Sequence, residues 1–185
     1  KSLEVTDALI EDVLGLSYGG GRTWAVLATL FDHVDTRMQY HEDHVFPRSQ
    51  LDARALKAFK AADGSRRYSD DAIDELVKRR DLLPNLELLP GPENIGKSDT
   101  APDAWAADHY PGADEYAAFL KANALPGVLP HGVDDFLDFY DARRALLIAR
   151  IKEKLRTQVA TVPPVEVAPA STDIDAELGE GDLDD

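Results

Sequence analysis

Patterns of apolar and polar residues predict helices over most of the chain. Apolar side chains recur at the three- or four-residue spacing that is typical of amphipathic helices. The expected helices cover residues 4–14, 22–34, 50–62, 70–80, 113–124 and 132–158. Ser69 is a good N-cap for the helix over 70–80, whose basic last turn complements the helix dipole. The helix over 132–158 is the longest, and Pro163 and Pro164 end it.

Two short segments are expected to be extended instead. Residues 38–42 form the first, and Pro47 stops regular pairing after it. Leu86, Leu88 and Leu89 mark the second, which ends at Pro90. A short helix over residues 93–108, interrupted near Pro102, follows. The pattern therefore predicts an α+β fold that is mostly α.

Composition limits the class of protein. A chain of 185 residues fits one domain, or one domain with a tail. It has no cysteine, which excludes disulfides and cysteine-ligated zinc. It has no signal-like start and no apolar run long enough to span a membrane. We therefore expect a soluble, cytoplasmic protein with no membrane partner.

The net charge of −15 argues against nucleic acid as a partner, but the charges are unevenly distributed. Residues 161–185 hold eight acids and no base, and we expect a disordered acidic tail there. Residues 48–80 hold nine bases and six acids, and residues 143–156 hold six bases and one acid. Each basic run is either a solvated helix face or a contact surface for DNA.

Candidate chemistry is concentrated in residues 41–48 and 83–99. The first stretch supplies an acid beside an imidazole, Asp43 and His44, and the second supplies two asparagines, Asn85 and Asn94. A neutral histidine can take a proton from water. A hard divalent cation prefers carboxylate and amide oxygens as ligands. Together these groups suit metal-dependent hydrolysis of a phosphodiester, whereas an Asp-His pair alone would be unremarkable.

The two stretches resemble the motifs of the HNH, or ββα-metal, endonucleases. Residues 43–49, Asp-His-Val-Phe-Pro-Arg-Ser, are similar to the first motif of that family, and residues 85–89 and 93–99 are similar to its second half. The order of the second half also resembles the HNH domains of CRISPR effector nucleases. Over roughly residues 10–110 the chain is most similar to the C-terminal nuclease region of GmrSD- and SspE-like bacterial restriction proteins.

The resemblance implies a role for each matching residue. His44 would be the general base, and Asp43 and Asn94 would be ligands of Mg²⁺ or Mn²⁺. Asn85 would pin the loop that carries the base. Lys97 and Arg48 would contact phosphate or DNA. His41, which shares the face of Asp43 in an extended segment, is a candidate second-layer support for the metal, although an ordinary exposed histidine is the alternative.

The chain departs from the minimal family pattern in one respect. The gap of 41 residues between His44 and Asn85 is longer than a compact ββα unit allows, so we interpret residues 50–82 as a helical insertion. The expected organisation is helical support over 1–37, a nuclease core over 38–110, C-terminal helices over 111–160 and the tail. Helices of the insertion that blocked the cleft would count against the resemblance.

Three functional hypotheses follow. The first is a DNA-nicking or DNA-cleaving endonuclease that acts in restriction or antiviral defence, with an NTP-dependent N-terminal sensor domain outside this chain and a homo-oligomeric state left open. The second is a nuclease-derived interaction module that no longer cuts. The third is a helical scaffold in which the Asp-His pair is coincidental. The intact set of Asp43, His44 and Asn94 favours the first.

Overall fold

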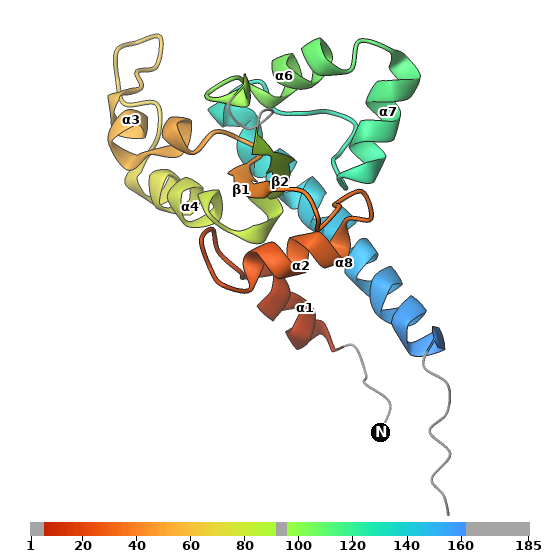
Figure 1. Ribbon diagram of the computed structural model, residues 1–185. Helices are drawn as coiled ribbons and strands as arrows, with labels where there is room; N and C mark the ends of the chain where they lie inside the picture. The colour runs from red at the N-terminus through yellow and green to blue at the C-terminus, as the bar shows by residue number, and fades with distance from the viewer. Residues whose placement is uncertain (1–5, 92–95, 162–185) are drawn as a thin grey trace, which may run out of the picture.

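The structure is a computed structural model, and it describes residues 6–91 and 96–161. Helices predominate around one small sheet (Figure 1), so the α+β class with mostly helical content is confirmed. The helices are α1 (Asp7–Leu14), α2 (Thr23–Leu30), α3 (Ala53–Ala58), α4 (Asp70–Arg80), α6 (Pro102–His109), α7 (Ala113–Ala122) and α8 (Phe136–Thr161). Short 3₁₀ turns cover Arg48–Leu51, Leu83–Asn85 and Val133–Asp135. None of the helices described is long and apolar enough to cross a membrane.

The sheet consists of two antiparallel strands near the middle of the molecule (Figure 1). Strand β1 (Tyr40–His44) pairs with β2 (Leu86–Pro90), and Asp43 lies opposite Glu87 while His44 lies opposite Leu86. The chain between the strands forms α3 and α4, which return it to the same end of the sheet. A long helical excursion therefore replaces the tight turn of an ordinary hairpin.

The two faces of the sheet pack against different groups of helices. Leu86 and Leu88 belong to a cluster with apolar residues of α1, α2 and the second half of α8. Leu89, with Val45 and Phe46 just after β1, belongs to a second cluster with α4, α6, α7 and the start of α8. Helix α8 contributes to both clusters and so joins the two halves, as its predicted apolar stripe suggested.

The first strand lies two residues later than the sequence pattern indicated. Pairing begins at Tyr40 and continues through His44, because five consecutive residues of β2 provide partners up to that position. The predicted segment 38–42 is therefore wrong in its bounds. Asp43 and His44 are strand residues, and their side chains leave opposite faces of the sheet.

Two predicted helices are shorter than expected for local reasons. The helix predicted over 50–62 is divided at Asp52, whose carboxylate accepts hydrogen bonds from the amides of Arg54 and Ala55 and so begins α3. The helix predicted over 22–34 ends at Leu30, because Phe31 is extended and buried. The cap expected at Ser69 is confirmed by its hydrogen bond from the amide of Ala72.

The short helix predicted over 93–108 is described only in part. Residues 92–95 lie outside the described residues, and so does the acidic tail beyond residue 161. Residues 96 and 97 are helical, residues 98–101 are not, and α6 begins at Pro102, so the interruption expected near Pro102 is confirmed. Proline lacks an amide hydrogen and is well tolerated in the first turn of a helix, which is why the new helix can begin there.

The central position of α8 gives a stability prediction. Leu147 is fully buried in α8, and the change Leu147→Ala should lower the free energy of unfolding by about 2–5 kcal/mol, since it removes apolar contacts and leaves a cavity. Urea denaturation measures this change. The neighbouring Leu146, which is 40% exposed, is the matched control, and Leu146→Ala should cost less than about 0.5 kcal/mol. Equal losses in the two variants would contradict the described packing.

Candidate functional site

A cleft of about 630 Å³ opens at the end of β1. Asp43 and His44 of β1 line it together with residues that follow the strand, with Arg80 at the end of α4 and with residues near 98. The full lining is Asp43, His44, Pro47, Arg48, Ser49, Asp52, Arg80, Ser98 and Asp99. The two ends of the predicted insertion supply Asp52 and Arg80. The insertion therefore forms a wall of this cleft and leaves it open.

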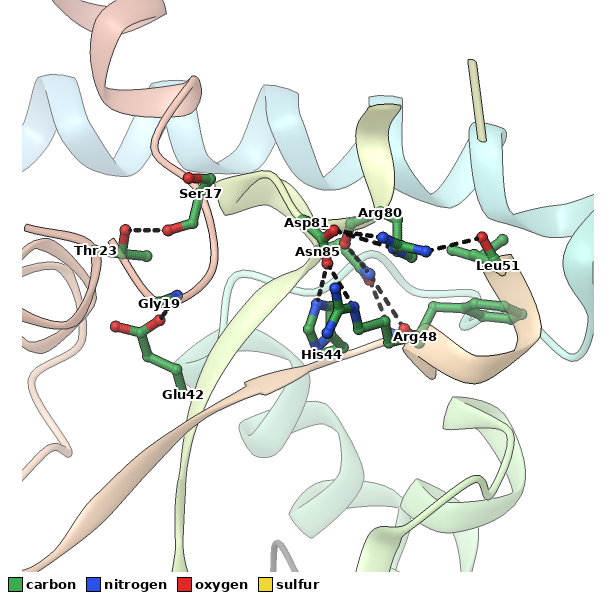
Figure 2. A network of polar contacts seen from close by, with 11 residues as sticks. Ser17, Gly19, Thr23, Glu42, His44, Arg48, Leu51, Arg80, Asp81 and Asn85 are labelled. Carbon is green, nitrogen blue, oxygen red and sulfur yellow. Dashed lines mark hydrogen bonds and ion pairs between the residues drawn. The ribbon is translucent and has the colours of Figure 1, made fainter. Parts of the chain in front are cut away.

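His44 is held by contacts with two distant segments. Its Nε2 lies 2.9 Å from Oδ1 of Asp81 (Figure 2). Its ring centroid lies 4.6 Å from that of Tyr18. The side chain is nearly buried, and this burial lowers the pKa of His44 below its ordinary value of 6.5, although the hydrogen bond that the imidazole donates to Asp81 acts in the opposite direction. His44 is therefore neutral near neutral pH.

Asp81 remains a carboxylate at the same pH. Burial alone would raise its pKa, but hydrogen bonds from Arg80 and His44 and the nearby charge of Arg48 lower it overall. Oδ2 of Asp81 accepts from Nη2 of Arg80 at 2.8 Å, and Nε of Arg48 lies 3.3 Å from Oδ1 (Figure 2). The backbone carbonyl of Asp81 also accepts a hydrogen bond from the amide of Tyr18. Asp81 therefore contacts the imidazole through its carboxylate, and through its backbone carbonyl it also holds the backbone of Tyr18, the other residue in contact with the ring.

Asn85 secures the loop that follows His44. Its Oδ1 accepts from the amide of Phe46 at 2.9 Å, and its Nδ2 donates to the carbonyls of Phe46 and Arg80 at 3.1 and 2.8 Å. The side chain is fully buried. These three bonds tie the segment after β1 to the end of α4 and to the turn that precedes β2.

Asp43 belongs to a separate, buried ionic cluster on the opposite face of β1. Its Oδ2 lies 2.7 Å from Nζ of Lys97, which also forms a close ion pair with Glu87 and donates to the carbonyl of His44 at 2.7 Å. Lys97 is only 2% exposed. An ammonium has three protons to donate, and all three have protein acceptors here. This placement does not fit the phosphate contact that was predicted for Lys97.

The remaining predicted residues differ in their placement. Arg48 lines the cleft and its side chain is 56% exposed, so its guanidinium is accessible to a phosphate. His41 is exposed and its ring lies near Gly91, but it is not among the residues that line the cleft. Asn94 lies outside the described residues, so the structure does not show whether it approaches Asp43.

The carboxylate oxygens of the cleft suit a hard divalent cation better than a soft metal ion. Among the described residues there is no group of three or more histidine, cysteine or acidic side chains that could hold a metal. Mg²⁺ needs less, because one or two carboxylates suffice when waters and substrate phosphates complete its coordination. Asp43 and Asp99 both offer carboxylates to the cleft. The residues present therefore fit Mg²⁺ or Mn²⁺ bound at Asp43.

Sequence reasoning missed Asp81, Glu87, Tyr18 and Asp99. Asp81 is 37 residues from His44 and follows a helix, where an acid is unremarkable. Glu87 interrupts a run of leucines, and this was the one available signal for a buried charge in a strand. Tyr18 lies in a glycine-rich segment, residues 15–21, where the sequence pattern indicates only a break between two helices. No model of a known protein family matches the chain, and no curated protein is similar to it.

The buried cluster gives a stability prediction for Lys97. The change Lys97→Met should lower the free energy of unfolding by about 3–5 kcal/mol, because it leaves two carboxylates facing each other without their cation. Adding Glu87→Gln should restore part of the loss. Chemical denaturation of the two variants measures both effects, with the exposed Lys78→Met as control. A Lys97→Met protein as stable as the parent would contradict the buried cluster.

Proposed function

We propose that this chain is a divalent-metal-dependent endonuclease domain of the HNH type, which hydrolyses phosphodiester bonds in DNA. One observation carries the proposal: Asp43 and His44, which are adjacent in β1, both line the same cleft although they point to opposite faces of the sheet. The antiparallel pair of strands and the loop held by Asn85 add support, since both agree with the motif resemblance. Action in bacterial restriction or antiviral defence, with a sensor domain elsewhere, belongs to the same proposal.

His44 acts as the general base in this proposal. It is neutral near neutral pH, and its ring is held by Tyr18 and Asp81. When Nε2 carries the proton and donates it to Asp81, Nδ1 is the nitrogen that can accept a proton from water. The carboxylate of Asp81 then stabilises the imidazolium that forms, in the way that acids orient catalytic histidines in other hydrolases.

Asp43 and Asn94 would hold the metal ion, and Arg48 would bind an oxygen of the scissile phosphate. When bound, Mg²⁺ or Mn²⁺ supplies positive charge that offsets the charge developing on the phosphate and on the leaving alkoxide. The guanidinium of Arg48 offers planar, charged donors that match phosphate oxygens. Its contact with Asp81 keeps it beside the cleft in the absence of DNA.

The contact between Lys97 and Asp43 favours a second candidate function. The ammonium occupies one carboxylate oxygen of the proposed metal ligand, as a built-in cation would. A nuclease-derived domain that no longer cuts, and that serves in protein interaction, is consistent with that contact. The two candidates differ in whether purified protein cleaves DNA.

The decisive experiment is relaxation of supercoiled plasmid with Mg²⁺ or Mn²⁺. The parent chain should convert supercoiled plasmid to open circles, and a chelator should abolish this activity. His44→Ala should reduce the rate at least ~100-fold, the scale expected for loss of a general base. His131→Ala removes a surface histidine outside the cleft and is the matched control, with an expected rate equal to that of the parent. Equal rates for the parent and His44→Ala would refute this assignment.

The pH dependence of cleavage tests the state of His44. Activity should rise with pH as the imidazole loses its proton. The midpoint of this rise in the pH–rate profile should lie below the ordinary histidine pKa of 6.5, since burial lowers the pKa of His44. In Asp81→Asn the hydrogen bond and charge that oppose this shift are lost, so the midpoint should move to still lower pH while the maximal rate falls. If the ascending part of the pH–rate profile of Asp81→Asn instead shifts to higher pH, Asp81 does not raise the pKa of His44 as described.

A further inference from the structure

The bases of residues 48–80 occupy three different environments. Arg48 and Arg80 are at the cleft and contact Asp81. Arg79 pairs with Glu75 and Asp141 on the side of α8. The other bases of interest lie between the start of α3 and the start of α4, in a segment that we name the basic arm, residues 54–67. The arm contains five bases and one acid: Arg54, Lys57, Lys60, Arg66, Arg67 and Asp63.

The arm has a defined conformation. Beyond α3, Lys60 and Arg66 form an antiparallel bridge, and the amide of Ala61 donates to the carbonyl of Ser65 at 2.9 Å. Gly64 closes the turn with a φ of +82°, a conformation that side chains with a Cβ rarely adopt. Arg67 at the root of the hairpin pairs with Asp134, before α8. The part of the arm that follows α3 is thus a short hairpin, and it projects from the body beside that helix (Figure 1).

The arrangement of charge on this hairpin is unfavourable unless an anion is nearby. Lys60 and Arg66 lie directly opposite each other across the bridge, and like charges in that position destabilise the pairing. Asp70 pairs with Arg66, but the side chains of Arg54, Lys57 and Lys60 make no ion pair with any residue that the structure describes. All three side chains are exposed. In a chain with a net charge of −15, this concentration of unpaired cations indicates an anionic partner.

The arm is continuous with the wall of the cleft. Asp52 lines the cleft and caps α3, and Arg54 and Lys57 follow on one side of that helix, three residues apart. Six residues of helix rise by about 9 Å, and the first three residues of the hairpin can add about 10 Å. The tip therefore reaches up to about 20 Å from the cleft, which corresponds to roughly six base-pair steps of a duplex.

We propose that the basic arm binds the phosphate backbone of duplex DNA next to the cleft. This inference rests on the proposed nuclease function and adds to it the surface that holds the substrate. Contacts of this kind position a duplex without reading its sequence. Arg54, Lys57 and Lys60 provide the free cations, while Arg66 and Arg67 use their ion pairs to hold the hairpin in place.

The test compares two variants with the same loss of charge. Arg54→Gln/Lys57→Gln/Lys60→Gln removes the free cations of the arm. Lys121→Gln/Lys152→Gln/Arg156→Gln removes three cations from α7 and α8, none of which lines the cleft, and is the control with the same loss of charge. Fluorescence anisotropy with a labelled duplex and excess chelator measures affinity between about 50 mM and about 200 mM salt. Thermal unfolding of both variants establishes that they fold like the parent.

The arm variant should bind duplex DNA at least ~10-fold more weakly than the parent at low salt. The slope of log affinity against log salt should fall by up to about 2.7, because each lost phosphate contact contributes about 0.9. The control should bind like the parent. In plasmid cleavage the arm variant should show a raised KM and an unchanged kcat, which separates a binding defect from loss of the chemical site.

Three results would overturn the inference. An arm variant with the affinity and salt slope of the parent would show that the arm does not touch DNA. Equal losses in both variants would show that bulk charge alone matters. A preference for single-stranded over duplex DNA would assign the surface to another ligand. If the parent cuts DNA and the arm variant binds and cuts like the parent, only the proposed role of the arm is refuted. If the parent binds duplex DNA without cutting it and the arm variant binds more weakly, the nuclease is refuted and the role of the arm is supported.

Discussion

The buried ammonium of Lys97 is the contact on which the centre of this structure depends. It joins the segment after β2 to both strands of the sheet, since Asp43, the carbonyl of His44 and Glu87 all accept its protons. Removing charges from water is costly, and the cost is offset only when each charge finds partners. Glu87 also acts electrostatically on the fully buried Arg143 of α8, whose pKa burial lowers to about 10. The position of Asp43 at the cleft therefore depends on a cluster that extends to the longest helix.

His44 depends on a different set of contacts, on the other side of β1. The residues that hold it come from the loop before α2 and from the end of α4, and the hydrogen bond between the amide of Tyr18 and the carbonyl of Asp81 joins those two segments. An imidazole held in this way loses little freedom when it accepts a proton, which is how a rigid scaffold assists a general base. The side chains of the two adjacent residues thus have different partners, whereas Lys97 contacts both the carboxylate of Asp43 and the backbone carbonyl of His44.

The helical excursion between the strands connects the proposed chemistry with the proposed substrate contact. It begins and ends at the wall of the cleft, at Asp52 and Arg80, and carries the basic arm between them. The net charge of −15 makes this local reversal of charge more significant, because an excess of acid in the chain as a whole disfavours contact with DNA. A nuclease domain with this distribution would bind DNA in one orientation, with the duplex along the arm and a phosphate at Arg48.

The sequence by itself determined the helical character of the chain, the position of β2, the cap at Ser69 and the long apolar stripe of α8, because each depends on local propensity or on a short period. It also indicated Asp43, His44 and Asn85 through a motif. The tertiary structure alone decided that β1 continues through His44, that Lys97 is buried between carboxylates and that Asp81 contacts the imidazole. His44 and Asp81 are 37 positions apart and Asp43 and Lys97 are 54 apart, although Glu87 and Lys97 are only 10 apart. No local pattern encodes which distant partner will satisfy a buried charge.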